Sequence, residues 1–314
     1  MFISQVFKYK HEFWRYLLGS AIIFMGVMLG QIPITAALFF SIDLKELANM
    51  DESEMLAQLD PNLSLFLMLL VFAVGLVFIL GVARFLHNQP IRALTTSRPK
   101  IDWSRFWFAF ILVGCVLLVL TLADYFMNPQ DYVLNFQPIP FLILLVIAVI
   151  FIPLQTSCEE YLFRAYLMQG IGVMARNKWL PLIITSVIFG GLHFFNPEVE
   201  KMGNIIMVYY IGTGFMLGIL ALMDEGIELA LGFHAANNLI TALLVTADWT
   251  AFQTYSIFKD ISEPTAGLDI LLPVLVIYPI FLFIFAKKYK WNNWKERLFG
   301  KVEEPAELKV SEEF

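Results

Sequence analysis

Charged residues are scarce in this 314-residue chain. Only 15% of its residues are Asp, Glu, Lys or Arg, whereas 59% are hydrophobic and the mean hydropathy is +0.72. Ordinary globular domains carry about 25% charged residues. A soluble protein of this size cannot bury so much apolar surface, because surface area falls too slowly with mass. The composition therefore excludes the soluble two-domain protein that length alone would favour.

Cysteine and histidine are also rare, and the chain has no excess of basic charge. The chain has two cysteines, four histidines and a formal net charge of −6. Two cysteines in or beside apolar runs give no disulfide framework. A nucleic-acid partner is not expected, since it would require a basic face.

Long apolar runs are what the sequence has in abundance. Runs of the length that crosses a bilayer lie at 17–40, 65–83, 106–123, 141–158, 180–195, 205–223, 227–246 and 270–286. Each is expected to be a helix, because lipid offers the backbone no hydrogen-bond partner. None alternates as the strands of a membrane barrel would. The sequence predicts an all-α fold, a polytopic membrane helical bundle of about eight transmembrane helices, whose first run is retained because it is too long for a signal-peptide core.

The distribution of lysine and arginine predicts the orientation in the bilayer. With the N-terminus in the cytoplasm, 18 of the 21 basic residues lie on the inner side, and the outer loops hold Lys45, Lys201 and Lys259. We therefore expect both termini to be cytoplasmic. The short loops favour a prokaryotic cytoplasmic membrane. Residues 1–300 are expected to form one integral membrane domain, and the acidic stretch 301–314 a disordered tail.

Polar side chains lie in or directly beside three of the apolar runs. They are Glu159, Glu160, Arg164, His193, His234 and Asn238. In a helix, Glu160 and Arg164 share one face, and Glu159 points about 100° away. His234 and Asn238 also share a face. Each group alone has an ordinary explanation, such as a helix end, a satisfied core histidine or an interhelical hydrogen bond. A charge at mid-bilayer costs about 2.5–3.5 kcal/mol, so together the six favour one interior cavity.

The order and spacing of these residues resemble three signature motifs of a protease family. Glu159-Glu160-x-x-x-Arg164, Phe189-x-x-x-His193 and His234-x-x-x-Asn238 are similar to those of the CPBP (CAAX protease and bacteriocin-processing, or Abi) intramembrane proteases, which include the type II CAAX prenyl endopeptidases. The catalytic core would then span about 141–245. The sequence departs from the family pattern at Ala165, where glycine is frequent, and at Ala235 and Ala236, where a larger residue is frequent. Neither departure removes a catalytic group.

The resemblance implies hydrolysis of a peptide bond in a membrane-associated protein or peptide, of the CAAX type or the leader type, at a site that opens to the cytoplasm. By motif, Glu159 would be the general base on water, assisted by His193. His234 and Asn238 would hold the oxyanion. Glu160 and Arg164 would order the site.

No obligatory cofactor is expected, although the family is commonly labelled a metalloprotease and a metal-free glutamate mechanism is also argued for it. Glu159, His193 and His234 would be the ligands if a zinc is present. The chain has no HExxH motif, and arginine and asparagine are not zinc ligands. Cys158 beside Glu159 matches no Cys–His protease signature, and a small apolar residue is the simpler interpretation.

Two other functions remain open on the sequence alone. A proton- or ion-coupled transporter would also bury Glu, Arg and His, and it predicts helices broken in paired positions. Here only Pro153, Pro273 and Pro279 interrupt the runs, with no convincing repeat. A catalytically inactive scaffold or immunity protein would tolerate the loss of Glu159.

One conflict concerns depth. With the simplest arrangement of spans, Glu159 lies near the cytoplasmic surface, whereas His193 lies about 20 Å along its own helix from that surface. The two side chains can then not meet. We predict that the fourth helix starts later than residue 141, kinks at Pro153 and carries Glu159 deeper.

Overall fold

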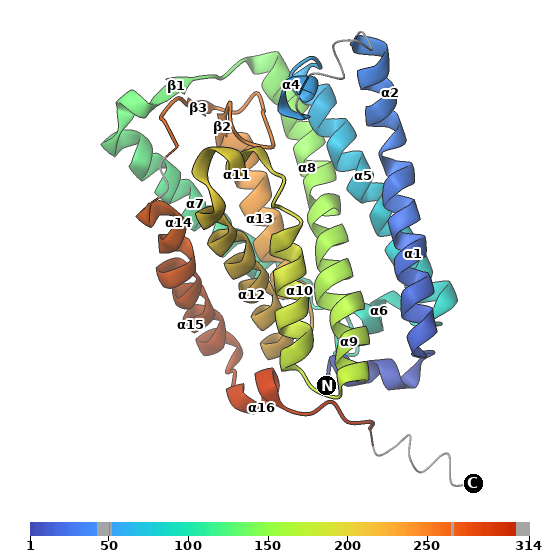
Figure 1. The fold of residues 1–314 in the computed structure, drawn as a ribbon. Helices are drawn as coiled ribbons and strands as arrows, with labels where there is room; N and C mark the ends of the chain where they lie inside the picture. The colour runs from blue at the N-terminus through green and yellow to red at the C-terminus, as the bar shows by residue number, and fades with distance from the viewer. Residues whose placement is uncertain (43–49, 51, 265–266, 306–314) are drawn as a thin grey trace, which may run out of the picture.

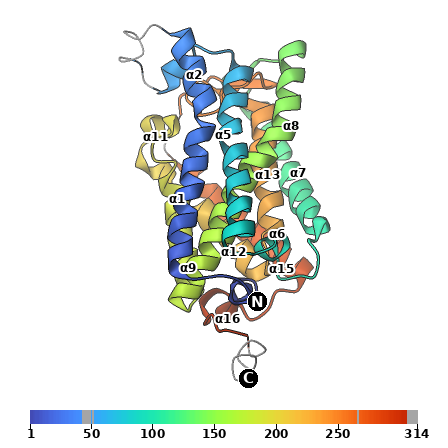
Figure 2. The ribbon, with the colours of Figure 1, turned by 90° about the vertical axis from the view of Figure 1, so that its right-hand side faces the viewer.

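The computed structural model describes residues 1–42, 50, 52–264 and 267–305. Its α-helices are α1 Phe13–Gly30, α2 Ile32–Ser41, α4 Glu52–Leu56, α5 Pro61–Gly81, α6 Ile91–Thr95, α7 Trp103–Met127, α8 Pro138–Glu160, α9 Met168–Ala175, α10 Trp179–Gly191, α11 Pro197–Met202, α12 Met207–Asp224, α13 Glu228–Leu244, α14 Leu268–Leu272, α15 Tyr278–Tyr289 and α16 Trp294–Phe299. Segments of π-helix are η2 Val82–Leu86, η4 Tyr161–Leu167 and η6 Pro273–Ile277, and short 3₁₀ helices are η1 Ile3–Lys8, η3 Pro129–Asp131 and η5 Asn204–Ile206. Figures 1 and 2 show the long helices running side by side as one bundle.

The bundle is that of a polytopic membrane protein, as predicted. Within the described residues, 6 helices are long and apolar enough to cross a membrane: Phe13–Ser41, Pro61–Leu86, Trp103–Met127, Pro138–Ala175, Asn204–Asp224 and Ile270–Tyr289. The predicted runs 180–195 and 227–246 form α10 and α13, which have 13 and 17 residues. The predicted number of eight spans is thus approximate, because two of the eight helices are shorter than a full crossing.

The fourth span is longer than expected. α8, η4 and α9 form one helical segment of 38 residues, which passes through Pro153 and ends where Arg176 adopts a left-handed conformation (φ 56). Glu159 lies 16 residues before the end of that segment, about 24 Å along the helix. The predicted later start is wrong, because α8 starts at Pro138, whereas the kink at Pro153 and the greater depth of Glu159 in the membrane stay predictions. The helix continues past Glu159 because Glu160 and Arg164 pair with each other inside the bundle. These charged residues therefore do not mark the end of the helix.

Small residues set the distance between α10 and α12. A Cβ built on Gly190 would lie 2.8 Å from the backbone nitrogen of Ile211, and one on Gly214 would lie 2.7 Å from the backbone oxygen of Ser186. These distances are too short for any side chain, so the two backbones approach closely at glycines. The remaining long helices pack as α1 on α5, α5 on α8, and α13 on both α7 and α8.

The segments that carry most of the basic residues meet at one end of the bundle, the lower end in Figure 1. There Lys10 N donates to His87 O (3.0 Å), and Val302 N donates to Arg176 O (3.0 Å). The N-terminal segment and the C-terminal part of the described residues, which end at residue 305, therefore lie on the same side of the bundle, whereas their cytoplasmic location stays a prediction. Val302 is buried, so the first residues of the predicted tail pack on the bundle. Residues 306–314 lie outside the described residues, and their disorder stays a prediction.

A buried ion cluster, which the sequence analysis did not predict, closes the same end. Arg98 pairs with Asp224 (2.8 Å) and with Glu228 (3.1 Å), and Arg105 also pairs with Asp224. Both carboxylates are buried. The cluster therefore joins the α6–α7 connection and the start of α7 to the α12–α13 connection.

The opposite end holds a small sheet that an all-α prediction did not include. β3 (Phe258–Asp260) pairs antiparallel with β1 (Tyr132–Leu134) and parallel with β2 (Val245–Ala247). The strands are three residues each. The sheet supplies hydrogen-bond partners to the backbone of the segments that follow α7, α13 and β2. The strands therefore form without the alternating hydrophobic pattern that is typical of strands.

Candidate active site

A fully buried ion pair forms the base of the site. The guanidinium of Arg164 lies 3.1 Å from Oε1 of Glu160, and both side chains are 0% exposed. Arg164 also donates to the backbone oxygen of Gly214 (3.3 Å) and lies 4.1 Å from the centroid of the Phe189 ring. A buried charge persists only when it is paired and hydrogen-bonded. The predicted helical stacking of Glu160 and Arg164 is therefore present, within the π-helical turn of η4 and the end of α8.

His234 lies between the two adjacent carboxylates. Its Nδ1 is 2.8 Å from Oε1 of Glu160, and its Nε2 is 3.5 Å from Oε2 of Glu159. A carboxylate bonded to Nδ1 fixes the tautomer and the ring orientation of a histidine. Glu160 therefore directs the other nitrogen of His234 toward Glu159.

His193 reaches the site from the turn that follows α10. The helix ends at Gly191, so the prediction that His193 lies inside a span from 180 to 195 is wrong. His193 lies in the turn that follows the 13-residue helix, and among the described residues it makes no hydrogen bond or ion pair with Glu159. Its Nδ1 donates to the carbonyl oxygen of Phe189 (2.8 Å), which leaves Nε2 as an acceptor.

One aromatic ring joins the three motifs. The ring centroid of Phe189 lies 4.9 Å from that of His193 and 6.0 Å from that of His234. Tyr210, from the start of α12, stacks on the other side of His193, with centroids 4.4 Å apart and planes 23° apart. The two histidines are therefore held by packing as well as by hydrogen bonds.

Asn238 lies one helical turn beyond His234 and has a partner that the sequence analysis missed. Its Nδ2 donates to Oε1 of Gln155 (3.1 Å), which lies one turn before Glu159 on α8. A polar residue four positions before Glu159 was a usable signal, because positions i and i+4 share a helix face. Tyr210 gave no comparable signal, since aromatic residues are common in apolar helices.

Two carboxylate oxygens of the site have no donor. Among the described residues, neither Oε2 of Glu159 nor Oε2 of Glu160 has a hydrogen-bond partner, although both atoms are buried. Leaving a buried polar atom unpaired costs about 1–3 kcal/mol. Such an atom in a native structure requires an explanation, and a catalytic role is one of the accepted explanations.

The donor set does not fit a zinc ion. In the part of the chain that the structure describes, no three His, Cys, Asp or Glu side chains are grouped so that they could hold a metal. Oε1 of Glu160 already accepts from Arg164 and His234. The conditional zinc set of Glu159, His193 and His234 is therefore not assembled. Cys158 is buried in an apolar cluster, as expected of a small apolar residue.

The side chains along two elements of the site become more exposed toward the end of the bundle that carries the small sheet. Along α13, His234 is 5% exposed, Asn238 is half-buried and Thr241 is exposed. Along α10 and the turn after it, Phe189 is 3% exposed and Phe195 is 85% exposed. Exposure thus increases away from the basic end. The predicted cytoplasmic opening, which came from the family resemblance, stays a prediction.

The fold is that of an integral membrane helical bundle, and comparison with known proteins gives its family. A family model described as type II CAAX prenyl endopeptidase Rce1-like matches residues 138–240, which hold all six predicted site residues. The chain is 30% identical over 238 residues to "Uncharacterized protein YyaK" of Bacillus subtilis (strain 168), with 76% of this chain and 79% of that protein covered. No solved structure matches. The chain belongs to the type II CAAX prenyl endopeptidase Rce1-like family.

Proposed function

We propose that the protein is an intramembrane endopeptidase that hydrolyses a peptide bond in a membrane-associated protein or peptide of the CAAX type or the leader type. The observation that carries the proposal is Oε2 of Glu159. This atom is buried, lies 3.5 Å from Nε2 of His234 and accepts no hydrogen bond from the described residues. A carboxylate in such surroundings is suited to bind and deprotonate a water molecule. The family match supports the same chemistry.

The proposed reaction needs no covalent enzyme intermediate. Glu159 takes a proton from water while the water oxygen attacks the carbonyl carbon of the scissile bond. His193 assists through Nε2, which its bond to the Phe189 carbonyl leaves free to accept. The C–N bond of the tetrahedral intermediate then breaks, and the proton on Glu159 passes to the leaving amine. The products are a carboxylate and an amine, so one water molecule is consumed for each bond.

Asn238 and His234 are the proposed donors to the oxyanion; because the Nδ1 hydrogen of His234 is given to Glu160, His234 donates from Nε2 in this proposal as the doubly protonated imidazolium. Asn238 uses one amide hydrogen for Gln155 (3.1 Å), and its second amide hydrogen remains for the substrate. One preorganised donor of this kind contributes about 10²–10³-fold to the rate. Glu160 and Arg164 act through His234, which they orient from the buried side of the site.

The test is cleavage by purified protein in liposomes, with prenylated CAAX-type and leader-type peptides anchored in the same membrane. We expect Glu159→Gln to lower kcat by about 10²–10⁴-fold, the usual contribution of a general base. Glu200→Gln, which changes an exposed carboxylate at the outer end, is the matched control and keeps full activity. Equal cleavage by wild type and Glu159→Gln would reject the proposal. Proton flux without cleavage would favour a transporter, and neither activity would favour an inactive scaffold.

We also propose that the reaction requires no bound metal, because the carboxylates and histidines of the site are not grouped as metal ligands. Cleavage should stay within about 2-fold of its initial rate after dialysis against a strong chelator, a change below 0.5 kcal/mol in the barrier. The same preparation is then supplied with zinc. Activity that is lost on chelation and restored by zinc would contradict this prediction.

A further inference from the structure

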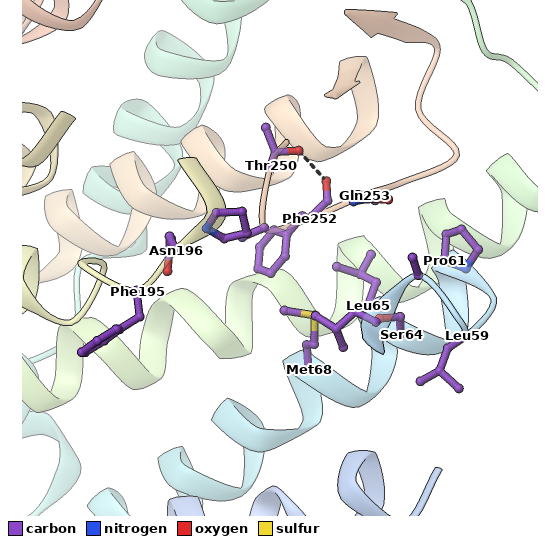
Figure 3. Close-up of a pocket in the computed structure, with 14 residues that line it drawn as sticks. Leu59, Pro61, Ser64, Leu65, Met68, Phe195, Asn196, Thr250, Phe252 and Gln253 are labelled. Atoms are coloured by element: carbon purple, nitrogen blue, oxygen red, sulfur yellow. Dashed lines mark hydrogen bonds between the residues drawn. The ribbon is translucent and has the colours of Figure 1, made fainter. Parts of the chain in front are cut away.

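A pocket of about 180 Å³ lies at the outer end of the bundle, away from the six site residues. Figure 3 shows that its walls come from three separate segments. α5 provides Leu65 and Met68, the turn after α10 provides Asn196, and the loop after β2 provides Ala251 and Phe252. The pocket lies at the end toward which the exposure of the site increases.

The pocket and the site share one turn of the chain. Asn196 N donates to the backbone oxygen of His193 (3.1 Å), so a single turn connects the pocket wall to the site histidine. The side chain of Asn196 reaches the hydroxyl of Tyr210 (3.5 Å), and Tyr210 stacks on His193. The pocket wall is therefore connected to His193 both through the backbone of this turn and through Tyr210.

Two contacts hold the loop that forms one wall of the pocket. Phe252 packs against the apolar cluster that joins α5, α8 and α13. The backbone nitrogen of Ala251 donates to Oε1 of Glu198 (2.9 Å), which ties the loop to α11. Binding sites are usually preformed in this way, because ordering a loop on binding lowers affinity.

The size and lining of the pocket indicate the ligand. Sites for whole small molecules typically measure about 300–1,000 Å³, so this pocket fits only part of a larger ligand. Leu65, Met68 and Phe252 supply apolar contact, whereas Ser64 and Asn196 bring a hydroxyl and an amide. An apolar side chain on a peptide backbone uses both kinds of group. A lipid acyl chain would leave the polar groups unpaired.

We propose that this pocket is a specificity subsite that seats one bulky apolar side chain of the substrate peptide, a few residues from the scissile bond. The inference rests on the proposed peptidase function. It adds a direction of approach, from the end opposite the basic segments. With this direction, the predicted cytoplasmic opening of the site and the predicted cytoplasmic location of the basic end cannot both hold.

The first experiment does not depend on catalysis. Glu159→Gln protein in liposomes is mixed with membrane-anchored peptides that carry photo-leucine at one position at a time, and crosslinks are mapped by mass spectrometry. We expect one peptide position to crosslink to Met68 or to residues 250–253. Ala251→Phe, which fills the pocket while keeping the backbone bond to Glu198, should reduce that crosslink at least 10-fold. Crosslinks confined to other surfaces, or unchanged in Ala251→Phe, would overturn the proposal.

The second experiment measures preference in the active protein. Peptides with Ala, Leu, Phe or Trp at the crosslinked position are compared by kcat/KM. We expect wild type to favour Leu or Phe over Ala by about 10–200-fold, the usual range for an apolar pocket, and Ala251→Phe to abolish the preference. Met68→Ala, which enlarges the pocket, should raise kcat/KM for the peptide with Trp at that position. Ala123→Phe, at an exposed position on α7 outside the pocket, is the control. Preference unchanged in Ala251→Phe, or phospholipid bound to the pocket in place of peptide, would reject the subsite.

The two proposals fail in different ways. Absence of cleavage by wild type, with the expected crosslinks present, would reject the peptidase and leave the pocket as a peptide-binding site. Cleavage that depends on Glu159 but ignores the pocket variants would reject only the subsite.

Discussion

Glu159 and Glu160 are neighbours in the chain, and their surroundings differ. Glu160 is completely buried and bonded to both Arg164 and His234. The side chain of Glu159 is 13% exposed, and its Oε2 has no donor among the described residues. At the scale of single residues, the structure therefore gives Glu160 a positioning environment and leaves Glu159 available to a ligand.

This difference predicts that substitutions of Glu160 and of Glu159 change the stability of the protein to different extents. Glu160→Ala should destabilise the protein by about 3–5 kcal/mol, because it leaves the buried charge of Arg164 without a partner. Glu159→Gln removes no hydrogen bond from a described residue and should change the melting temperature little. Thermal unfolding in detergent, followed by circular dichroism, measures both variants. A Glu160→Ala protein as stable as wild type would show that the buried ion pair is not needed for the fold.

The sequence predicted those site residues whose polar side chains are unusual in an apolar run. Charged and histidine side chains in apolar runs have few ordinary explanations, so the sequence identified the groups that now surround His234. The helical spacing of Glu160 and Arg164 also predicted their contact. Tyr210 could not be predicted, because its role depends on which helix packs against His193, and an aromatic residue fits any lipid-facing or buried position.

At the scale of helices, the close contact between α10 and α12 positions His193. Gly190 directly follows Phe189 and lies three residues before His193, and its Cα is close to the backbone of Ile211. Gly191 is the next residue, and a Cβ built there would meet nothing within 4 Å. The pair provides a matched comparison of crowded and open positions.

Gly190→Ala should therefore separate the two helices and destabilise the protein by about 1–3 kcal/mol, the usual cost of overpacking. Cleavage should fall with it, since His193 moves with the end of α10. Gly191→Ala should be neutral or slightly stabilising, because alanine favours a helix over glycine by about 0.5–1 kcal/mol. Melting temperatures and kcat/KM of the two variants provide the measurement. Equal effects of the two substitutions would contradict the close contact.

Helix positions were predicted better than helix ends. Apolar runs identify segments that must hide their backbone polar groups from lipid, and every predicted run contains a helix. The continuation of the fourth helix from Glu160 to Ala175 was missed, because charged residues after an apolar run usually mark a membrane surface. Here Arg164 is satisfied by Glu160 and Gly214 within the bundle. Hydropathy alone cannot distinguish these two cases.

At the scale of the whole molecule, the two ends differ in charge and in architecture. One end gathers the chain ends and the buried ion cluster of Arg98, Arg105, Asp224 and Glu228. The other end carries the small sheet and the pocket. The excess of lysine and arginine predicts that the first end is cytoplasmic.

Labelling of single cysteines tests this orientation. Asp248→Cys, at the outer end, and Lys301→Cys, at the basic end, are each placed in a background with Cys115→Ser and Cys158→Ser. A membrane-impermeant maleimide should label Asp248→Cys in intact cells and Lys301→Cys only after lysis, because both positions are exposed on opposite ends. The reverse pattern would invert the predicted topology and bring the pocket into the cytoplasm.

The single helical segment from Pro138 to Ala175 has a consequence for the choice of bond. Its 38 residues make a rod of about 57 Å, nearly twice the hydrocarbon thickness of about 30 Å. A rod of that length tilts or protrudes to match its surroundings, and Glu159 moves with it. For the proposed peptidase, a thicker membrane would place the carboxylate opposite a different residue of an anchored substrate, so the length of the lipid chains would influence which bond is cut.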